Sequence, residues 1–588
     1  MSPRRHGDAA RQRHRLATVA PGVEALKSYQ PSWLPKDIVA GLVLTALLVP
    51  QGMAYAELAG LPAITGLYTS ILCLLAYALF GPSRVLVLGP DSSLGPMIAA
   101  TLLPLIAANG DPKRAIALAS MMAILVGVIN ILVGVAKLGF IADLLSKPTR
   151  IGYLTGLALT IVVGQLPKLF GFSVDATGLI HETSAFARGV VDGKTVPAAL
   201  TIGMIGLLLI LVLQRWLAKV PGVLVTVVLS IAAVVVFDLA SHGVKLVGVL
   251  PKGFPPFTIP DVSLSDFPVL LGGAIGIALV SLTDTISTAT AFAAKLGQKV
   301  RPNQEMIAIG AANAAAGLFQ GFAVSTSGSR TAVANQSGAR TQLTGVVGAL
   351  AVAAMLLFVP GLLRNLPQPT LAAVVIAAST SLVDFTGLRR LWQLSRVEFT
   401  LAIAAFLAVA LLGVLLGIAV AVGLSILNVF RRSWWPYNTV LGEVDGIPGF
   451  HDIRSYPDAR QYAGLVIYRF DAPLFFANTR TFNQQIRDLA GADPCPRWIV
   501  VAAEPITDVD TTAADMLTEL DASLNKRHIS LVFAEMKDPV RKKIDRFELT
   551  DTIDPTHFFP TVDAAVAAFA SSGSDDDARF GSADGDLR

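Results

Sequence analysis

The chain alternates long apolar stretches with short polar segments from about residue 38 to residue 430. A membrane helix needs about 20 apolar residues. That window predicts spans near 38–56, 64–80, 114–135, 151–167, 197–214, 221–240, 267–291, 341–360 and 398–430, the last long enough for two helices. Shorter apolar segments near 92–105, 305–319, 329–337 and 369–382 bring the prediction to about 14 membrane segments.

The amino-acid composition also indicates a protein that crosses the membrane many times. Hydrophobic residues make up 53% of the chain, charged residues 15%, and the mean hydropathy is +0.62. These values are typical of a polytopic membrane protein and exclude a soluble enzyme. The chain has no Gly-x-x-x-x-Gly-Lys-Ser/Thr motif for ATP, its seven histidines fall outside the predicted spans, and its basic residues form no single patch for nucleic acid.

The placement of basic residues predicts the topology. Cytoplasmic loops are enriched in Lys and Arg, and alternate loops here contain Arg84, Lys137, Lys147, Arg150, Arg215, Lys219, Lys295, Lys299, Arg301, Arg389, Arg390, Arg396, Arg431 and Arg432. With an Arg-rich N-terminal segment (1–30) in the cytosol, both termini are expected to be cytoplasmic. The predicted location is a plasma or inner membrane.

A polar motif interrupts the first span at Val49-Pro50-Gln51-Gly52. Proline and glycine in mid-membrane free backbone groups, which protein or a water-filled pocket must then satisfy. We therefore expect a broken helix that lines a cavity, with Gln51 in its wall. A Pro-Gly kink relaxed by neighbouring helices is the alternative interpretation.

Two Gly/Ser-rich breaks, 89–96 and 325–331, occupy corresponding places in the two halves of the membrane region and each opens a short apolar helix. Such pairing is typical of inverted repeats with discontinuous helices. Their N-termini would project unpaired N–H groups and positive dipole ends into one pocket, which favours an anion. Two unrelated loops at opposite membrane faces are the alternative.

Asp284 lies inside an apolar span, where a charge costs roughly 2.5–3.5 kcal/mol, so we expect it to face a cavity or a partner. Thr288 follows one turn later on the same face. Arg330, at the start of the second half-helix, is the expected partner of Asp284. The pair is either structural or functional, with Arg330 attracting an anion and Asp284 carrying a coupling ion. Asp91 is expected to cap its half-helix.

The motifs 49–55, 66–68, 89–90 and 329–330 resemble the SulP sulfate-permease family of anion transporters, whose relatives include prestin and pendrin. The resemblance implies seven-plus-seven inverted repeats, a core domain moving like an elevator against a gate domain, and a homodimer. It also implies substrate-binding residues Gln51, Tyr55, Asp91, Ser92, Ser93, Ser327, Gly328, Ser329 and Arg330, with Asp284 and Thr288 at the coupling-ion site. Many relatives carry a neutral residue in place of Asp91, so its charge points to proton-linked binding.

Residues 439–570 change character, with strand-like apolar runs alternating with amphipathic helices. The order resembles a STAS domain, so the membrane region should span 31–433 and the STAS domain 439–570. Asp510-Thr511-Thr512 falls where related antagonist proteins carry a phosphorylatable serine, and we favour a structural helix cap there. A dimerisation or regulatory role, with a cytosolic regulator as partner, is expected for this domain. The Ser/Gly/Asp-rich segment 571–588 predicts disorder.

The sequence thus predicts a secondary active transporter, not an enzyme, for a small anion such as sulfate, bicarbonate or a dicarboxylate. Symport with H⁺ or Na⁺ is expected, with no other cofactor. A passive anion channel or exchanger, a nucleobase symporter of the same uracil-carrier fold, and a membrane scaffold for a signalling STAS domain remain alternatives. The sequence does not choose among the three anions or between the two coupling ions.

Overall fold

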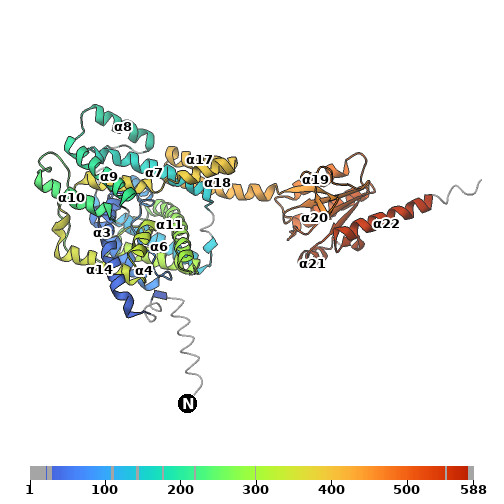
Figure 1. Cartoon of the computed structure of the whole chain (residues 1–588), viewed down its shortest axis with the longest axis horizontal. Coiled ribbons are helices and arrows are strands. Elements are labelled where there is room, and N and C mark those ends of the chain that lie inside the picture. The colour runs from blue at the N-terminus through green and yellow to red at the C-terminus, as the bar shows by residue number, and fades with distance from the viewer. Residues whose placement is uncertain are drawn as a thin grey trace, which may run out of the picture. The chain divides into compact units, whose positions relative to one another are not determined.

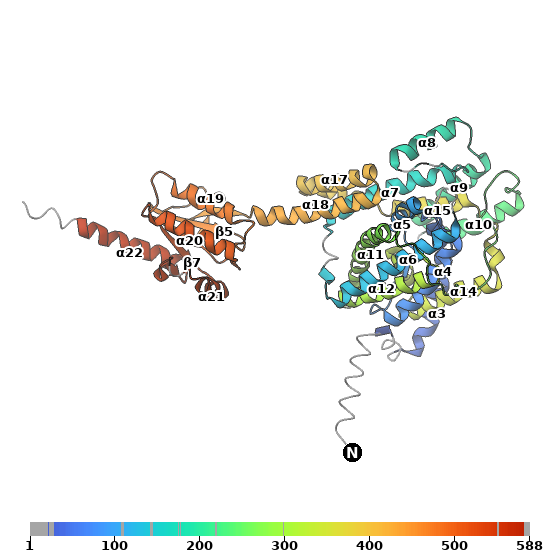
Figure 2. The same cartoon turned by 180° about the vertical axis from the view of Figure 1, so that it is seen from behind.

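The computed structural model describes residues 21–22, 29–106, 111–140, 145–174, 176, 178–217, 220–297, 299–549 and 552–580. Most of the N-terminal segment 1–30 therefore lies outside the described residues. Contacts between residues divide the chain into two units, Met1–Ser425 and Ile426–Arg588. The first is a bundle of helices and the second is built on a sheet (Figures 1 and 2).

Apolar helices make up most of the first unit. Eight described helices are long and apolar enough to cross a membrane. The helices of the bundle are α3 (Leu34–Leu58), α4 (Ala63–Phe80), α5 (Gly95–Leu102), α6 (Pro112–Val135), α7 (Lys147–Leu169), α9 (Pro197–Trp216), α10 (Gly222–Val236), α11 (Phe267–Leu296), α12 (Pro302–Leu318), α13 (Gly328–Gln336), α14 (Leu343–Phe358), α15 (Gln368–Thr380), α17 (Arg396–Leu412) and α18 (Val414–Trp434). The predicted span 398–430 is thus two helices, separated at Gly413, whose φ is +85°.

The expected break at Pro50 is wrong. Helix α3 is continuous and contains Pro50 in its interior, so the alternative interpretation of a tolerated proline is correct. Gly52 and Gly66 allow close packing instead, because a Cβ on Gly52 would lie 3.1 Å from the carbonyl oxygen of Gly66 of α4, and a Cβ on Gly66 only 1.9 Å from that of Gly52. The backbones of α3 and α4 therefore touch, and the helix stays intact where a larger residue would push them apart.

The contacts among helices reveal the inverted repeat. Helix α6 packs against α12 and α11, and α14 packs in the same way against α4 and α3. Exchanging the two halves of the chain converts one set of contacts into the other, which confirms the predicted repeat. We call α3–α6 and α11–α14 the core group. Helices α7, α9, α10, α15 and α17 pack mainly among themselves, and we call them the gate group.

Two short strands bring the half-helices together. Strand β1 (Leu88–Gly89) precedes α5, strand β2 (Ser325–Thr326) precedes α13, and the two pair antiparallel with Leu88 opposite Thr326. Further bonds extend this pairing, because the Ser327 N–H donates to the Val87 carbonyl oxygen at 3.0 Å. The two breaks in the chain are therefore held side by side inside the core group.

Two amphipathic helices were not expected from the sequence. Helix α8 (Leu179–Val191) lies between the predicted spans 151–167 and 197–214, and α16 (Phe385–Leu394) joins α15 to α17. Both are shorter than a membrane span and carry charged residues. The membrane window detects only apolar stretches, so it passes over helices of this kind.

The second unit is a six-stranded sheet with helices on both faces. Strand order is β4-β3-β5-β6-β7-β8, and β5 to β8 are parallel. The strands are β3 (Asn438–Val444), β4 (Ile447–Asp452), β5 (Leu465–Phe470), β6 (Trp498–Ala502), β7 (Ser530–Ala534) and β8 (Phe558–Phe559). Helices α19 (Thr479–Ala490), α20 (Thr511–Asn525) and α21 (Asp538–Arg546) contribute to the core on one face, and α22 (Val562–Phe580) to the core on the other.

Asp510 caps α20 as predicted, accepting a hydrogen bond from the Ala513 N–H at 2.8 Å. It also accepts one from the Phe476 N–H at 2.8 Å, which ties the preceding loop to the cap. The predicted disorder from residue 571 is wrong for residues 571–580, because α22 continues to Phe580. A helix already nucleated on the sheet extends at little cost. Residues 581–588 lie outside the described residues.

Candidate functional site

A cavity of about 1470 Å³ lies where the core group faces the gate group. It extends to the end of the bundle where α7 and α10 begin, since Lys147 and Gly222 are among its lining residues. Most of the sequence-predicted site residues line it, namely Gln51, Tyr55, Asp91, Ser92, Asp284, Thr288, Ser327, Gly328 and Ser329. Ser93 and Arg330 are not among its lining residues.

The N-terminus of α13 forms one wall of the cavity. Ser327 is its N-cap, and Gly328 and Ser329 are its first two residues. The N–H groups of these first residues have no intrahelical acceptor, and with the helix dipole they make an anion-binding end. The Ser327 and Ser329 hydroxyls, 3.1 Å apart, add two further groups that can donate to an anion.

Arg330 is fully buried and does not pair with Asp284, contrary to expectation. Its Nη2 donates to the Pro90 carbonyl oxygen at 2.6 Å, and Gly89 leaves room for the guanidinium, which a Cβ at that position would meet at 3.2 Å. Its Nε and Nη1 have no hydrogen-bond partner among the described residues. Arg330 therefore joins the two half-helices and places a positive charge behind α13 rather than in the cavity.

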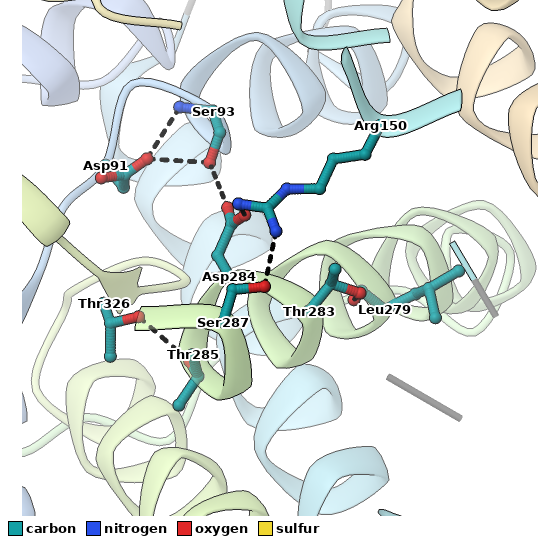
Figure 3. A network of polar contacts seen from close by, with 9 residues as sticks. All are labelled: Asp91, Ser93, Arg150, Leu279, Thr283, Asp284, Thr285, Ser287 and Thr326. Atoms are coloured by element: carbon teal, nitrogen blue, oxygen red, sulfur yellow. Dashed lines mark hydrogen bonds and ion pairs between the residues drawn. The ribbon is translucent and has the colours of Figure 1, made fainter. Parts of the chain in front are cut away.

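Asp284 pairs instead with Arg150, from the first turn of α7 (Figure 3). The distance from Arg150 Nη2 to Asp284 Oδ1 is 3.8 Å, and Arg150 Nη1 donates to the Ser287 hydroxyl at 2.5 Å. The Asp284 side chain is 15% exposed and that of Arg150 is 33% exposed. The half-buried acid is thus paired with a cation from the gate group.

A serine hydroxyl connects the two acids of the site. Ser93 Oγ lies 2.8 Å from Asp91 Oδ1 and 3.3 Å from Asp284 Oδ2, and the Ser93 N–H donates to Asp91 Oδ1 at 3.0 Å (Figure 3). A hydroxyl has one proton and can donate it to only one carboxylate at a time. Asp91 folds onto its own loop rather than capping α5, whose N-cap is Leu94. The predicted capping role of Asp91 is therefore wrong.

The sequence did not predict that Arg150 and Ser287 line the cavity beside Asp284. Arg150 counted only as a topological charge, because nothing along the chain places it near Asp284. Ser287 follows Asp284 by three residues, so helical spacing alone could have placed the two on one face.

The bundle, the paired half-helices and the polar cavity define a membrane transport protein of the inverted-repeat type. The model of the Sulfate permease family matches residues 34–405, and that of the STAS domain matches residues 456–565. The chain belongs to the sulfate permease family, as a multi-pass membrane protein with a C-terminal STAS domain.

Individual relatives agree with this assignment. A probable sulfate transporter of Mycobacterium tuberculosis is 42% identical over 553 residues, which cover 94% of this chain and 98% of that protein. The overall structure of SLC26A9 superimposes with a TM-score of 0.89 at 23% identity, covering 98% of this chain and 96% of that one. The transmembrane domain of the cyanobacterial bicarbonate transporter BicA gives a TM-score of 0.60 at 22% identity, over 67% and 99% of the two chains. The two structural likenesses concern the fold alone.

Proposed function

We propose that this protein is a secondary active carrier that takes up sulfate together with protons. The observation that carries the proposal is the open N-terminus of α13 facing a cavity that is also lined by the half-buried acid Asp284. One element attracts an anion and the other can take up a proton, so a single cavity holds the parts needed for symport.

Sulfate is the proposed anion for two reasons. Backbone N–H groups and serine hydroxyls at a helix N-terminus suit a tetrahedral oxyanion. The relative most fully covered here is named a probable sulfate transporter, and plant relatives from Arabidopsis thaliana are also named sulfate transporters. Bicarbonate and dicarboxylates satisfy the same donors and stay as alternatives for the experiment.

The surroundings of Asp284 support protons over sodium. Hard cations bind to several oxygen ligands at short distance. Here the guanidinium of Arg150 lies beside the Asp284 carboxylate and donates to Ser287, so a positive group already occupies that side. A proton needs only one carboxylate oxygen, and the hydroxyl of Ser93 reaches Asp284 Oδ2.

Movement of the core group against the gate group would expose the cavity to alternate sides. The separate packing of the two groups supports this elevator-like step. The Lys- and Arg-rich loops support a cytoplasmic location for both termini, in the plasma or inner membrane. Assembly as a homodimer and regulation through the STAS domain also remain proposals.

Uptake of labelled sulfate, bicarbonate and fumarate into proteoliposomes tests the proposal. The full chain is reconstituted and given an inward proton gradient, an inward sodium gradient, or neither. We expect proton-stimulated sulfate uptake, and we expect Asp284→Asn to remove the stimulation. Asp266→Asn is the matched control, because Asp266 begins the same helix but pairs with Arg114 at 2.9 Å, away from the cavity. Sulfate flux that is unchanged by either gradient and by either substitution would indicate a channel or exchanger.

A further inference from the structure

Arg150 carries an inference that rests on the proposed function and extends it. Its guanidinium reaches from α7 of the gate group to Asp284 on α11 of the core group (Figure 3). The ion pair Arg114–Asp266, in contrast, lies within the core group. Arg150 therefore contacts the site from the group of helices that contributes no half-helix to it.

The contact between Arg150 and Asp284 is loose. At 3.8 Å it is an ion pair but is too long for a hydrogen bond. The guanidinium has five N–H donors in a fork that matches an oxyanion, and only the bond to Ser287 is short. Arg150 also lines the same cavity as Ser327 and Ser329 and is partly exposed to it. It is thus able to bind a second acceptor in the cavity.

We propose that Arg150 is an anion-binding residue that exchanges partners, pairing with Asp284 when the site is empty and with the transported anion when Asp284 is protonated. A proton from the water of the cavity binds to the Asp284 carboxylate and forms a neutral carboxylic acid. The Arg150 guanidinium then has no negative partner. The anion bound at the N-terminus of α13 replaces the Asp284 carboxylate as its partner. Release of the proton restores the Arg150–Asp284 pair and expels the anion.

The exchange accounts for coupling in terms of charge. Besides Arg150, the titratable groups that face Asp284 are Tyr153 of α7 and Asp91 of the loop before α5. The other elements packed on α11, namely α6, α12 and β2, add no charged group beside it in the described part of the chain. When Asp91 and Asp284 are both charged, the two acids outweigh the one arginine and the site repels an anion. When Asp284 is protonated, Arg150 is free to bind the anion.

A double-mutant cycle tests the exchange. Equilibrium binding of labelled sulfate to the purified full chain is measured at neutral pH for the unsubstituted chain, Asp284→Asn, Arg150→Gln and the double variant. We expect Asp284→Asn to tighten sulfate binding by about fivefold, and Arg150→Gln to weaken it by about tenfold to a hundredfold. The specific expectation is that Asp284→Asn tightens binding much less once Arg150→Gln is present, because only the repulsion by the acid is then removed and no guanidinium remains to be released.

Two further variants keep the test sharp. Lys147→Gln removes another cation that lines the cavity on the same helix, and here Asp284→Asn should still tighten binding. Arg150→Lys keeps the charge without the fork and should retain part of the coupling. If Asp284→Asn tightens binding equally with and without Arg150→Gln, simple repulsion explains it and the exchange is wrong. If the unsubstituted chain binds no sulfate, the proposed function itself fails, and the inference with it.

Discussion

The two half-helices share a backbone arrangement but differ in chemistry. Helix α13 begins with Gly328 and Ser329 at the cavity wall, whereas the first residues of α5 do not line it. The N–H of Gly95 is directed to the Asp91 carbonyl oxygen at 3.3 Å, and Pro96 has no N–H. The first half-helix instead contributes an acid, Asp91, on the loop before it.

Duplication of the fold has therefore not produced two equivalent sites. The strand pair β1–β2 places both breaks at the same depth of the core group. One break then presents donors to an anion, and the other, with α11, presents acids that can hold protons. The repeat gives the two breaks equivalent positions, and the individual residues at each break give it a different chemistry.

The largest effect is expected from Arg330→Ala. The substitution removes the buried charge behind α13 and leaves the Pro90 carbonyl oxygen without its donor. Loss of a charged hydrogen bond of this kind corresponds to about a hundredfold weaker sulfate binding. Equilibrium binding of labelled sulfate measures it, together with the melting temperature in detergent. Normal sulfate binding by a folded Arg330→Ala variant would remove Arg330 from the anion site.

Gly328→Pro removes one backbone N–H from α13 and is expected to weaken sulfate binding by about tenfold. Proline is tolerated at the first residue of a helix. Gly328→Ala is the matched control, because a Cβ there has nothing closer than the Thr288 hydroxyl at 4.0 Å and the N–H remains. Equal binding by the two variants would contradict anion recognition by the α13 backbone.

Asp91→Asn removes a negative charge from the cavity while keeping an oxygen for the Ser93 bonds. We expect sulfate binding at neutral pH to become about two- to fivefold tighter, because one source of repulsion is gone. Binding measured across a pH series checks this. An unchanged pH series would mean that Asp91 does not take part in coupling.

Pro96→Ala is expected to have the smallest effect. It adds an N–H to the start of α5, which does not line the cavity, so sulfate affinity should change by less than about twofold. Measured beside Gly328→Pro, it compares the same kind of change at the two half-helices. A large gain in affinity would show that α5 also faces the anion.

Local patterns in the sequence identified much of the fold. Apolar length located the membrane helices, and the two Gly/Ser-rich breaks located the half-helices, because both signals lie within one segment. Helix α3 was misjudged at Pro50 because the local sequence does not show which helices pack against it, such as α4, whose Gly66 lies against Gly52. The amphipathic helices α8 and α16 were missed because they lack the apolar signal.

The candidate site was predictable in its residues but not in its pairings. Nine of the eleven expected residues line the cavity, among them Gln51, Asp284 and Ser329. The partner of Asp284 was not predictable, because Arg150 comes from the gate group and the packing of the two groups decides which cation reaches the acid. Charge along the chain shows that a partner is needed and not which residue supplies it.

The peptide N–H groups of α13 bear on how such a carrier can evolve. Every amino acid except proline supplies the same N–H, so most point mutations at Gly328 or Ser329 preserve that donor. The attraction of α13 for an anion therefore depends on the fold of the backbone and not on these side chains. A substitution at Asp91 leaves these N–H groups in place, so the coupling chemistry can change while the helix N-terminus still attracts anions.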